Sequence, residues 1–79
     1  MVITHKFQTI QELQRLQQLA CSLPDEVCLR SLEGDILVDA KSLINLFTLD
    51  YSKPVQIVTD AEEVAQLAEQ WGRPGAVSA

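Results

Sequence analysis

The chain has few residues of the kinds that build nucleic-acid and membrane sites. Only six of its 79 residues are Lys or Arg, against eleven Asp or Glu, and the formal net charge is −5. A chain of that balance lacks the basic surface that nucleic acid requires, and it favours partners that carry basic surfaces instead. No run approaches the ~18 apolar residues of a membrane span, and there is no signal-peptide core. We therefore expect a cytoplasmic protein that binds neither nucleic acid nor membrane.

Cysteine and histidine are equally scarce. Cys21 and Cys28 lie seven residues apart, without a CxxC motif and without a second pair of metal ligands. They are either a disulfide or redox pair, or two partly buried free thiols in a reducing compartment. The spacing favours free thiols. The one histidine is His5. Because there is also no Ser/His/Asp set and no glycine-rich phosphate loop, the sequence predicts no enzyme, no metal and no cofactor.

The length sets the size of the core. A chain of 79 residues, 47% of them apolar, can form one domain that buries roughly 60% of its unfolded surface. We assign residues 1–72 to this domain and residues 73–79 to a flexible C-terminal tail.

The first part of the chain alternates and then becomes helical. Residues 2–7 alternate as a half-buried strand does, with His5 as a half-exposed member. Thr9 and Glu12 are spaced as a capping box, in which the Thr9 hydroxyl accepts from the Glu12 N–H and the Glu12 side chain reaches back. Apolar residues then follow at helical spacing until Pro24 ends the helix; they are Ile10, Leu13, Leu16, Ala20 and Leu23.

The second part repeats both patterns. Residues 27–32 and 36–38 alternate on either side of the turn at residues 33–35, which predicts a hairpin, and residues 55–59 form a fourth strand. A second capping box at residues 60–63 opens a helix with an apolar stripe, and Gly72 fits the position after its end. The stripe consists of Val64, Leu67, Ala68 and Trp71.

The order β-α-β-β-α-β-α predicts an α+β fold. Two long helices and one short helix should cover one face of a four-stranded, mostly antiparallel sheet, which leaves the other face in contact with solvent as an open-faced β-sandwich.

The short helix lies in the most informative run, residues 38–49. Ser42 occupies its predicted N-cap, and the helix can be only about two turns long. A serine there places its hydroxyl beside unpaired backbone N–H groups, where a phosphate would be tolerated.

This run and the element order resemble HPr, the histidine-containing phosphocarrier protein of the bacterial sugar phosphotransferase system. The resemblance covers nearly the whole chain to Trp71, and its most specific part is Lys41-Ser42-Leu43. Family members carry Lys-Ser-(Leu/Ile) there, and in many Gram-positive members a regulatory kinase phosphorylates that serine. The resemblance therefore implies that Ser42 is a candidate phosphorylation site.

The family's relay motif is missing. In the HPr family, the relayed phosphate is carried by a histidine that caps the first helix, within a Gly-(Leu/Ile)-His-x-Arg-Pro-Ala stretch. In register, Thr9 takes the histidine position, Gln11 the arginine and Glu12 the proline. A hydroxyl is a much weaker nucleophile than an imidazole, and Gln11 brings no charge to clamp a phosphate. His5 falls inside the predicted first strand and cannot replace the missing histidine.

The resemblance thus implies a regulatory protein-interaction module. It is similar to the catabolite-repression relative of HPr, which lacks the histidine, keeps the serine and acts as a phosphoserine-dependent corepressor partner. Ser42 would be the phosphorylation switch of this module, or else it serves only as a helix cap. Partners would bind Leu43, Ile44 and Phe47, of which Ile44 is expected to be the most exposed. The alternative is an active phosphocarrier that uses a non-standard acceptor residue. We expect a monomer whose partners are proteins, namely a phosphotransferase-system component, HPr kinase or a transcription regulator.

Overall fold

Seven elements make up the computed structural model, which describes residues 1–71. The predicted helix end at Gly72 and the predicted tail, residues 73–79, lie outside the described residues. The elements are β1 (Val2–His5), α1 (Ile10–Ser22), β2 (Val27–Ser31), β3 (Leu37–Asp39), α2 (Leu43–Leu46), β4 (Val55–Thr59) and α3 (Glu62–Trp71).

The strands form one sheet in the order β1-β4-β2-β3, and every neighbouring pair is antiparallel. The central pair is β2 and β4, in which Leu29 faces Ile57 and Cys28 faces Val58. The α+β class, with one open antiparallel sheet of four strands and three helices, is confirmed. Within residues 1–71, no helix has the length and apolar character needed to cross a membrane.

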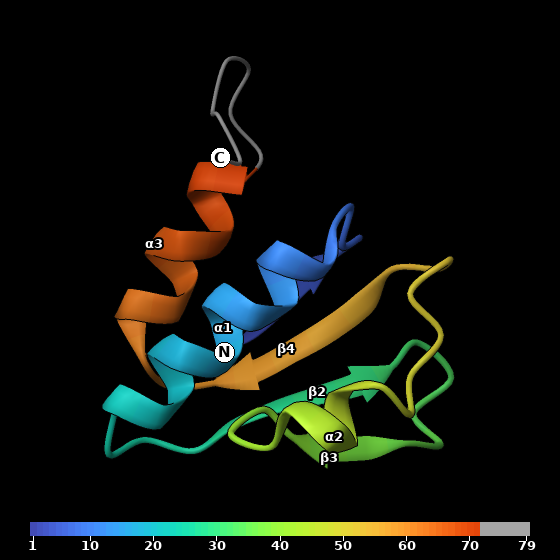
Figure 1. Ribbon diagram of the computed structural model, residues 1–79, viewed down its shortest axis with the longest axis horizontal. Helices are drawn as coiled ribbons and strands as arrows, with labels where there is room; N and C mark the ends of the chain where they lie inside the picture. The colour runs from blue at the N-terminus through green and yellow to red at the C-terminus, as the bar shows by residue number, and fades with distance from the viewer. Residues whose placement is uncertain (72–79) are drawn as a thin grey trace.

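One face of the sheet carries the core. Along β2, Val27 and Leu29 are fully buried while Cys28 between them is not, and β4 alternates in the same way. The inward side chains join one hydrophobic cluster with residues of all three helices, so the helices pack on the same face of the sheet. Figure 1 shows α1 and α3 together over that face and α2 beside β2 and β3. The opposite face, with Cys28 and Val58, is covered by no helix of the described chain.

The hairpin between β2 and β3 turns at Gly34. Its φ of 81° lies in the left-handed region that glycine enters without strain, and its N–H donates to the Ser31 carbonyl at 2.9 Å. Most predicted boundaries are close to the observed ones, and residues 55–59 agree at both ends. The first strand is shorter than predicted, because Phe7 leaves the strand and is buried under the helices.

The predicted second capping box is wrong. The Asp60 carboxylate does not cap α3; it lies 3.5 Å from the amino group of Met1, and its side chain is 95% exposed. The neighbouring Thr59 hydroxyl accepts from the Ala61 N–H at 3.1 Å and donates to the Glu26 carbonyl at 2.8 Å. Thr59 therefore fastens the start of α3 to the end of β4 and to the chain entering β2.

Helix α1 provides a matched test of the core. Leu16 is completely buried, whereas Ile10, predicted on the same apolar face, is 51% exposed. We expect Leu16→Ala to lower the free energy of unfolding by about 2–5 kcal/mol, because it leaves a cavity among packed side chains. Ile10→Ala should cost less than about 1 kcal/mol. Urea denaturation measures both, and equal losses would contradict the assignment of α1's buried face.

Candidate functional site

The predicted phosphorylation site, Ser42, precedes a single helical turn. Helix α2 contains four residues, so the prediction of about two turns is wrong. Ser42 holds the backbone position of an N-cap, at φ −110° and ψ 110°, and its carbonyl accepts from the Leu46 N–H at 3.2 Å. Its hydroxyl makes no capping hydrogen bond, contrary to the prediction. The residue therefore starts the helix through its backbone alone.

The chain enters α2 along a fixed path. The Ala40 N–H donates to the Val27 carbonyl at 2.8 Å, and the Lys41 N–H donates to the Asp39 carboxylate at 2.9 Å. The Gln17 side chain donates to the Lys41 carbonyl at 3.2 Å. Sheet and α1 thus both position the residue before Ser42.

Helix α2 divides its apolar side chains between core and solvent. Leu46 is fully buried, and Leu43 packs against the core. Ile44 is 81% exposed and Phe47, at the helix end, is 52% exposed. One helical turn cannot point four large side chains in one direction, because successive residues are rotated by about 100°. We call Ile44 and Phe47, with Leu43 at their border, the α2 surface.

Tyr51 holds the far end of α2. Its hydroxyl donates to the Leu46 carbonyl, and its ring meets that of Phe7 edge to face at a centroid distance of 5.6 Å. Burial raises the pKa of Tyr51 to about 12. The α2 surface therefore projects from a turn that is tied down at both ends.

Two of the three positions at which the sequence was compared with the HPr relay motif, Thr9 and Glu12, have structural roles. The Thr9 hydroxyl accepts from the Glu12 N–H at 3.3 Å, so this half of the predicted capping box is confirmed. The other half is wrong, because the Glu12 carboxylate accepts from the Gln8 N–H at 3.0 Å and not from Thr9. Gln11 is exposed. Ser42 is far from these residues, because Lys41 contacts α1 at Gln17, about two turns beyond Thr9.

His5 is the last residue of β1, which confirms its predicted place in the first strand, but its side chain is less exposed than the predicted half. Its Nε2 lies 3.1 Å from the Glu12 carboxylate, and only 15% of its side chain is exposed. The imidazole stacks on Trp71 at 4.8 Å and meets Phe7 edge to face at 4.6 Å. Sequence analysis missed this cluster, because no local pattern links a strand residue to the first turn of α1 and to the last residue of α3. A phosphate on His5 would lie against the Glu12 carboxylate.

The two cysteines are free thiols, and they lie on different sides of the sheet. Cys21 is on α1 and exposed, which corrects the prediction that both are partly buried, whereas Cys28 is on the open face. Burial, together with the nearby carboxylates of Glu26 and Asp39, raises the pKa of the Cys28 thiol.

Among residues 1–71 no cluster of three or more His, Cys, Asp or Glu side chains could hold a metal ion. Comparisons of the chain with protein-family models, with curated proteins and with solved structures find no match.

The buried Glu12 gives a testable consequence. Glu12→Ala removes the acceptor of the Gln8 N–H and the partner of His5, and we expect a loss of about 1–3 kcal/mol in the free energy of unfolding. Gln11→Ala, at the exposed neighbouring position, should change it by less than about 0.5 kcal/mol. Thermal unfolding of both variants at neutral pH measures the difference, and a Glu12→Ala protein as stable as the wild type would refute the cluster.

Tyr51 is the chain's single tyrosine, so its ionisation can be followed by absorbance near 295 nm. The pKa of Tyr51 is raised from 10.0 to about 12. Between these two pH values, the folded protein keeps a proton that the unfolded chain releases. Its contribution to stability is fully present below pH 10 and is lost as the pH rises towards 12. We expect a titration midpoint well above that of the urea-unfolded protein, and coincident midpoints would contradict a buried hydroxyl.

Proposed function

We propose that the protein is an HPr-like regulatory module that binds other proteins through the α2 surface and has lost the phosphoryl relay of its family. The observation that carries this proposal is the exposure of Ile44 and Phe47, at 81% and 52%, on a turn whose Leu46 is fully buried. Neighbouring exposed apolar side chains on a firmly held turn are a common form of protein-binding surface, because partners bury them at little cost in conformational entropy. No catalysis and no cofactor is needed for this role.

The resemblance to HPr supplies the family context. It is supported by the α+β fold with three helices on one open four-stranded sheet and by the run Lys41-Ser42-Leu43 immediately before α2. The partner class that follows from it is a phosphotransferase-system component, HPr kinase or a transcription regulator in the cytoplasm.

Ser42 is the proposed switch of this surface. Phosphorylation adds about −1.5 to −2 charges, and Ser42 directly precedes Leu43, which borders the α2 surface. Because the Ser42 hydroxyl is not used to cap α2, its modification removes no capping hydrogen bond from the helix. The added phosphate would change the charge beside Ile44 without requiring the fold to rearrange.

The alternative, an active phosphocarrier with a non-standard acceptor, is the weaker proposal. A carrier must present its acceptor to the active sites of two partners, whereas the Thr9 hydroxyl caps α1 and His5 is covered by Trp71 and paired with Glu12. No described side chain in the first turn of α1 brings a positive charge to a phosphate, since Gln11 stands where the family has arginine.

Treatment with HPr kinase and ATP tests the switch. We expect one acid-stable phosphate by intact mass, absent from Ser42→Ala and still present in Ser52→Ala, which alters an exposed serine on the loop after α2. In parallel, treatment with phosphoenolpyruvate and the general first enzyme of the phosphotransferase system should leave no acid-labile phosphate. An acid-labile phosphate on any residue would support the carrier instead, and no phosphate in either reaction would refute the switch at Ser42.

The α2 surface is tested separately with immobilised protein and the partners identified from the native cell. Ile44→Ser with Phe47→Ser should abolish capture of a partner that the wild type binds, since the apolar contact area is lost. Gln14→Ser with Gln18→Ser, on the exposed face of α1, should leave capture unchanged. Equal capture by both double variants would refute the α2 surface as the binding site.

A further inference from the structure

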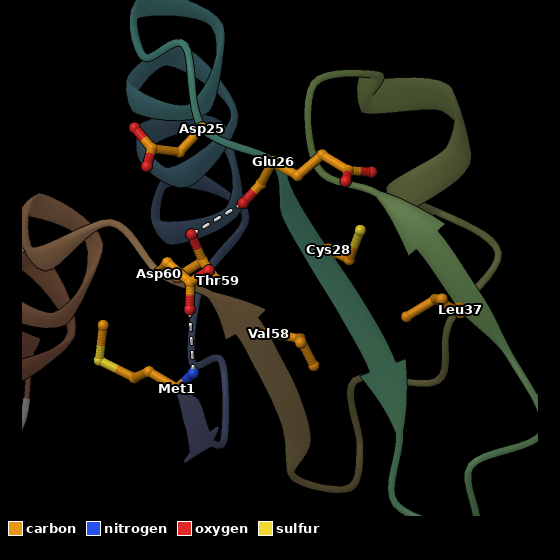
Figure 2. A pocket seen from close by; sticks show the side chains of 8 residues that line it. All are labelled: Met1, Asp25, Glu26, Cys28, Leu37, Val58, Thr59 and Asp60. Carbon is orange, nitrogen blue, oxygen red and sulfur yellow. Dashed lines mark hydrogen bonds and ion pairs between the residues drawn. The ribbon is translucent and has the colours of Figure 1, made fainter.

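The open face of the sheet contains a hollow that the proposed function does not use. Its volume is about 430 Å³, and its floor is formed by side chains from three adjacent strands, Val58 on β4, Cys28 on β2 and Leu37 on β3. Cys28 pairs directly with Val58, and Leu37 is 62% exposed. Figure 2 shows these three side chains in a row across the strands. The floor is therefore apolar and open to solvent.

One end of this hollow is ringed by carboxylates. Asp25 and Glu26 precede β2, and Asp60 follows β4, so the antiparallel pairing brings them to the same end of the sheet. Asp39, at the end of β3, pairs with Cys28, and the carboxylates of Glu26 and Asp39 both act on its thiol. The amino group of Met1 lies 3.5 Å from Asp60. Arg30, opposite Leu37, donates its Nε to Gln56 at 2.9 Å and marks the other limit of the acidic region.

The acidic rim is held in place. The Thr59 hydroxyl donates to the Glu26 carbonyl at 2.8 Å, which joins the end of β4 to the residue before β2, and Thr59 is only 5% exposed (Figure 2). The backbones that carry Glu26 and Asp60 are thus fixed relative to each other. A partner that meets these charges does not have to order the loops that present them.

We propose that this open face binds a basic amphipathic helix of a partner protein. The floor spans three strands, so its outer strands lie roughly 10 Å apart, which matches the diameter of one α-helix. The other face of the same sheet is already covered by helices. Aliphatic side chains of the partner would cover Val58, Cys28 and Leu37, and its Lys or Arg side chains would reach Glu26, Asp39 and Asp60.

Charge distinguishes this occupant from the others. A second copy of the chain placed face to face would bring two sets of the same carboxylates together, and anionic lipid or nucleic acid would meet them with like charge. A basic amphipathic helix is complementary to both the apolar floor and the acidic rim. The inference is independent of the α2 surface, because α2 packs on the opposite face of the sheet.

The test uses a fluorescein-labelled synthetic helix of 18 residues, leucine on one face and lysine on the other. We expect micromolar binding by anisotropy, weaker at high salt, with amide shifts at Cys28, Leu37 and Val58 by NMR. Glu26→Lys with Asp60→Lys should weaken binding about tenfold or more. The matched control, Glu33→Lys with Asp35→Lys, makes the same charge change at the hairpin turn and should weaken it less than about twofold.

A serine-for-leucine version of the peptide should bind at least about tenfold more weakly, because it cannot cover the floor. Unfolding midpoints establish that each variant remains folded. Equal weakening of peptide binding by both double variants would overturn the proposal, and so would amide shifts centred on Ile44 and Phe47. A third contrary result is sedimentation of the free protein as a dimer that Leu37→Lys dissociates, because the occupant of the open face would then be a second copy.

Discussion

The burial of apolar side chains on one face of the sheet is the constraint on which the rest of the structure depends. Val27, Leu29, Val55 and Ile57 are almost completely removed from water, and they are covered by α1 through Leu16 and Ala20. A chain of this length has enough apolar residues for one such layer and not for two. The opposite face must therefore stay open, and α2, which contributes only Leu46 and part of Leu43 to the core, must leave its remaining apolar side chains in solvent. Both proposed binding surfaces follow from this limit.

The first turn of α1 holds three elements of the fold together at the place where a phosphocarrier would present its histidine. A carrier histidine must remain accessible and must have a cation nearby to receive its phosphate. Here the same turn serves stability instead, because Thr9 caps the helix and Glu12 links the Gln8 N–H to His5. Trp71 then covers His5, so α3, β1 and α1 are joined at one point. The polar groups of this turn are therefore used inside the protein, which leaves the α2 surface as the part proposed to meet a partner.

The sequence predicted the elements well because their signals are local. Alternation over residues 27–31 and 55–59 and helical spacing from Leu13 to Ala20 depend on neighbours in the chain, and the structure agrees with them. The errors concern side chains whose partners come from elsewhere. The Asp60 capping box failed because the Asp60 carboxylate lies beside the amino group of Met1, 59 positions earlier in the chain. His5 was placed as half-exposed because its cover, Trp71, is 66 positions away. The exposure of Ile44 was predictable, since it follows from the shortness of α2. The hollow on the open face was not predicted, because it depends on three strands and on the loops at their ends.

The two surfaces differ in chemistry, and this difference has a functional consequence. The α2 surface is apolar, and its proposed regulator is a negative charge added at Ser42, whereas the open face carries permanent carboxylates. The two surfaces meet near Asp39, because the Ser42 N–H donates to the Asp39 carbonyl at 3.3 Å. A phosphate at Ser42 would therefore lie within the screening length of this rim carboxylate, which is about 8–10 Å at physiological salt. Phosphorylation should therefore alter binding at the α2 surface and also strengthen the attraction of the open face for a basic partner. A small module built in this way can let one added charge act on two binding surfaces, with no conformational change between the two states.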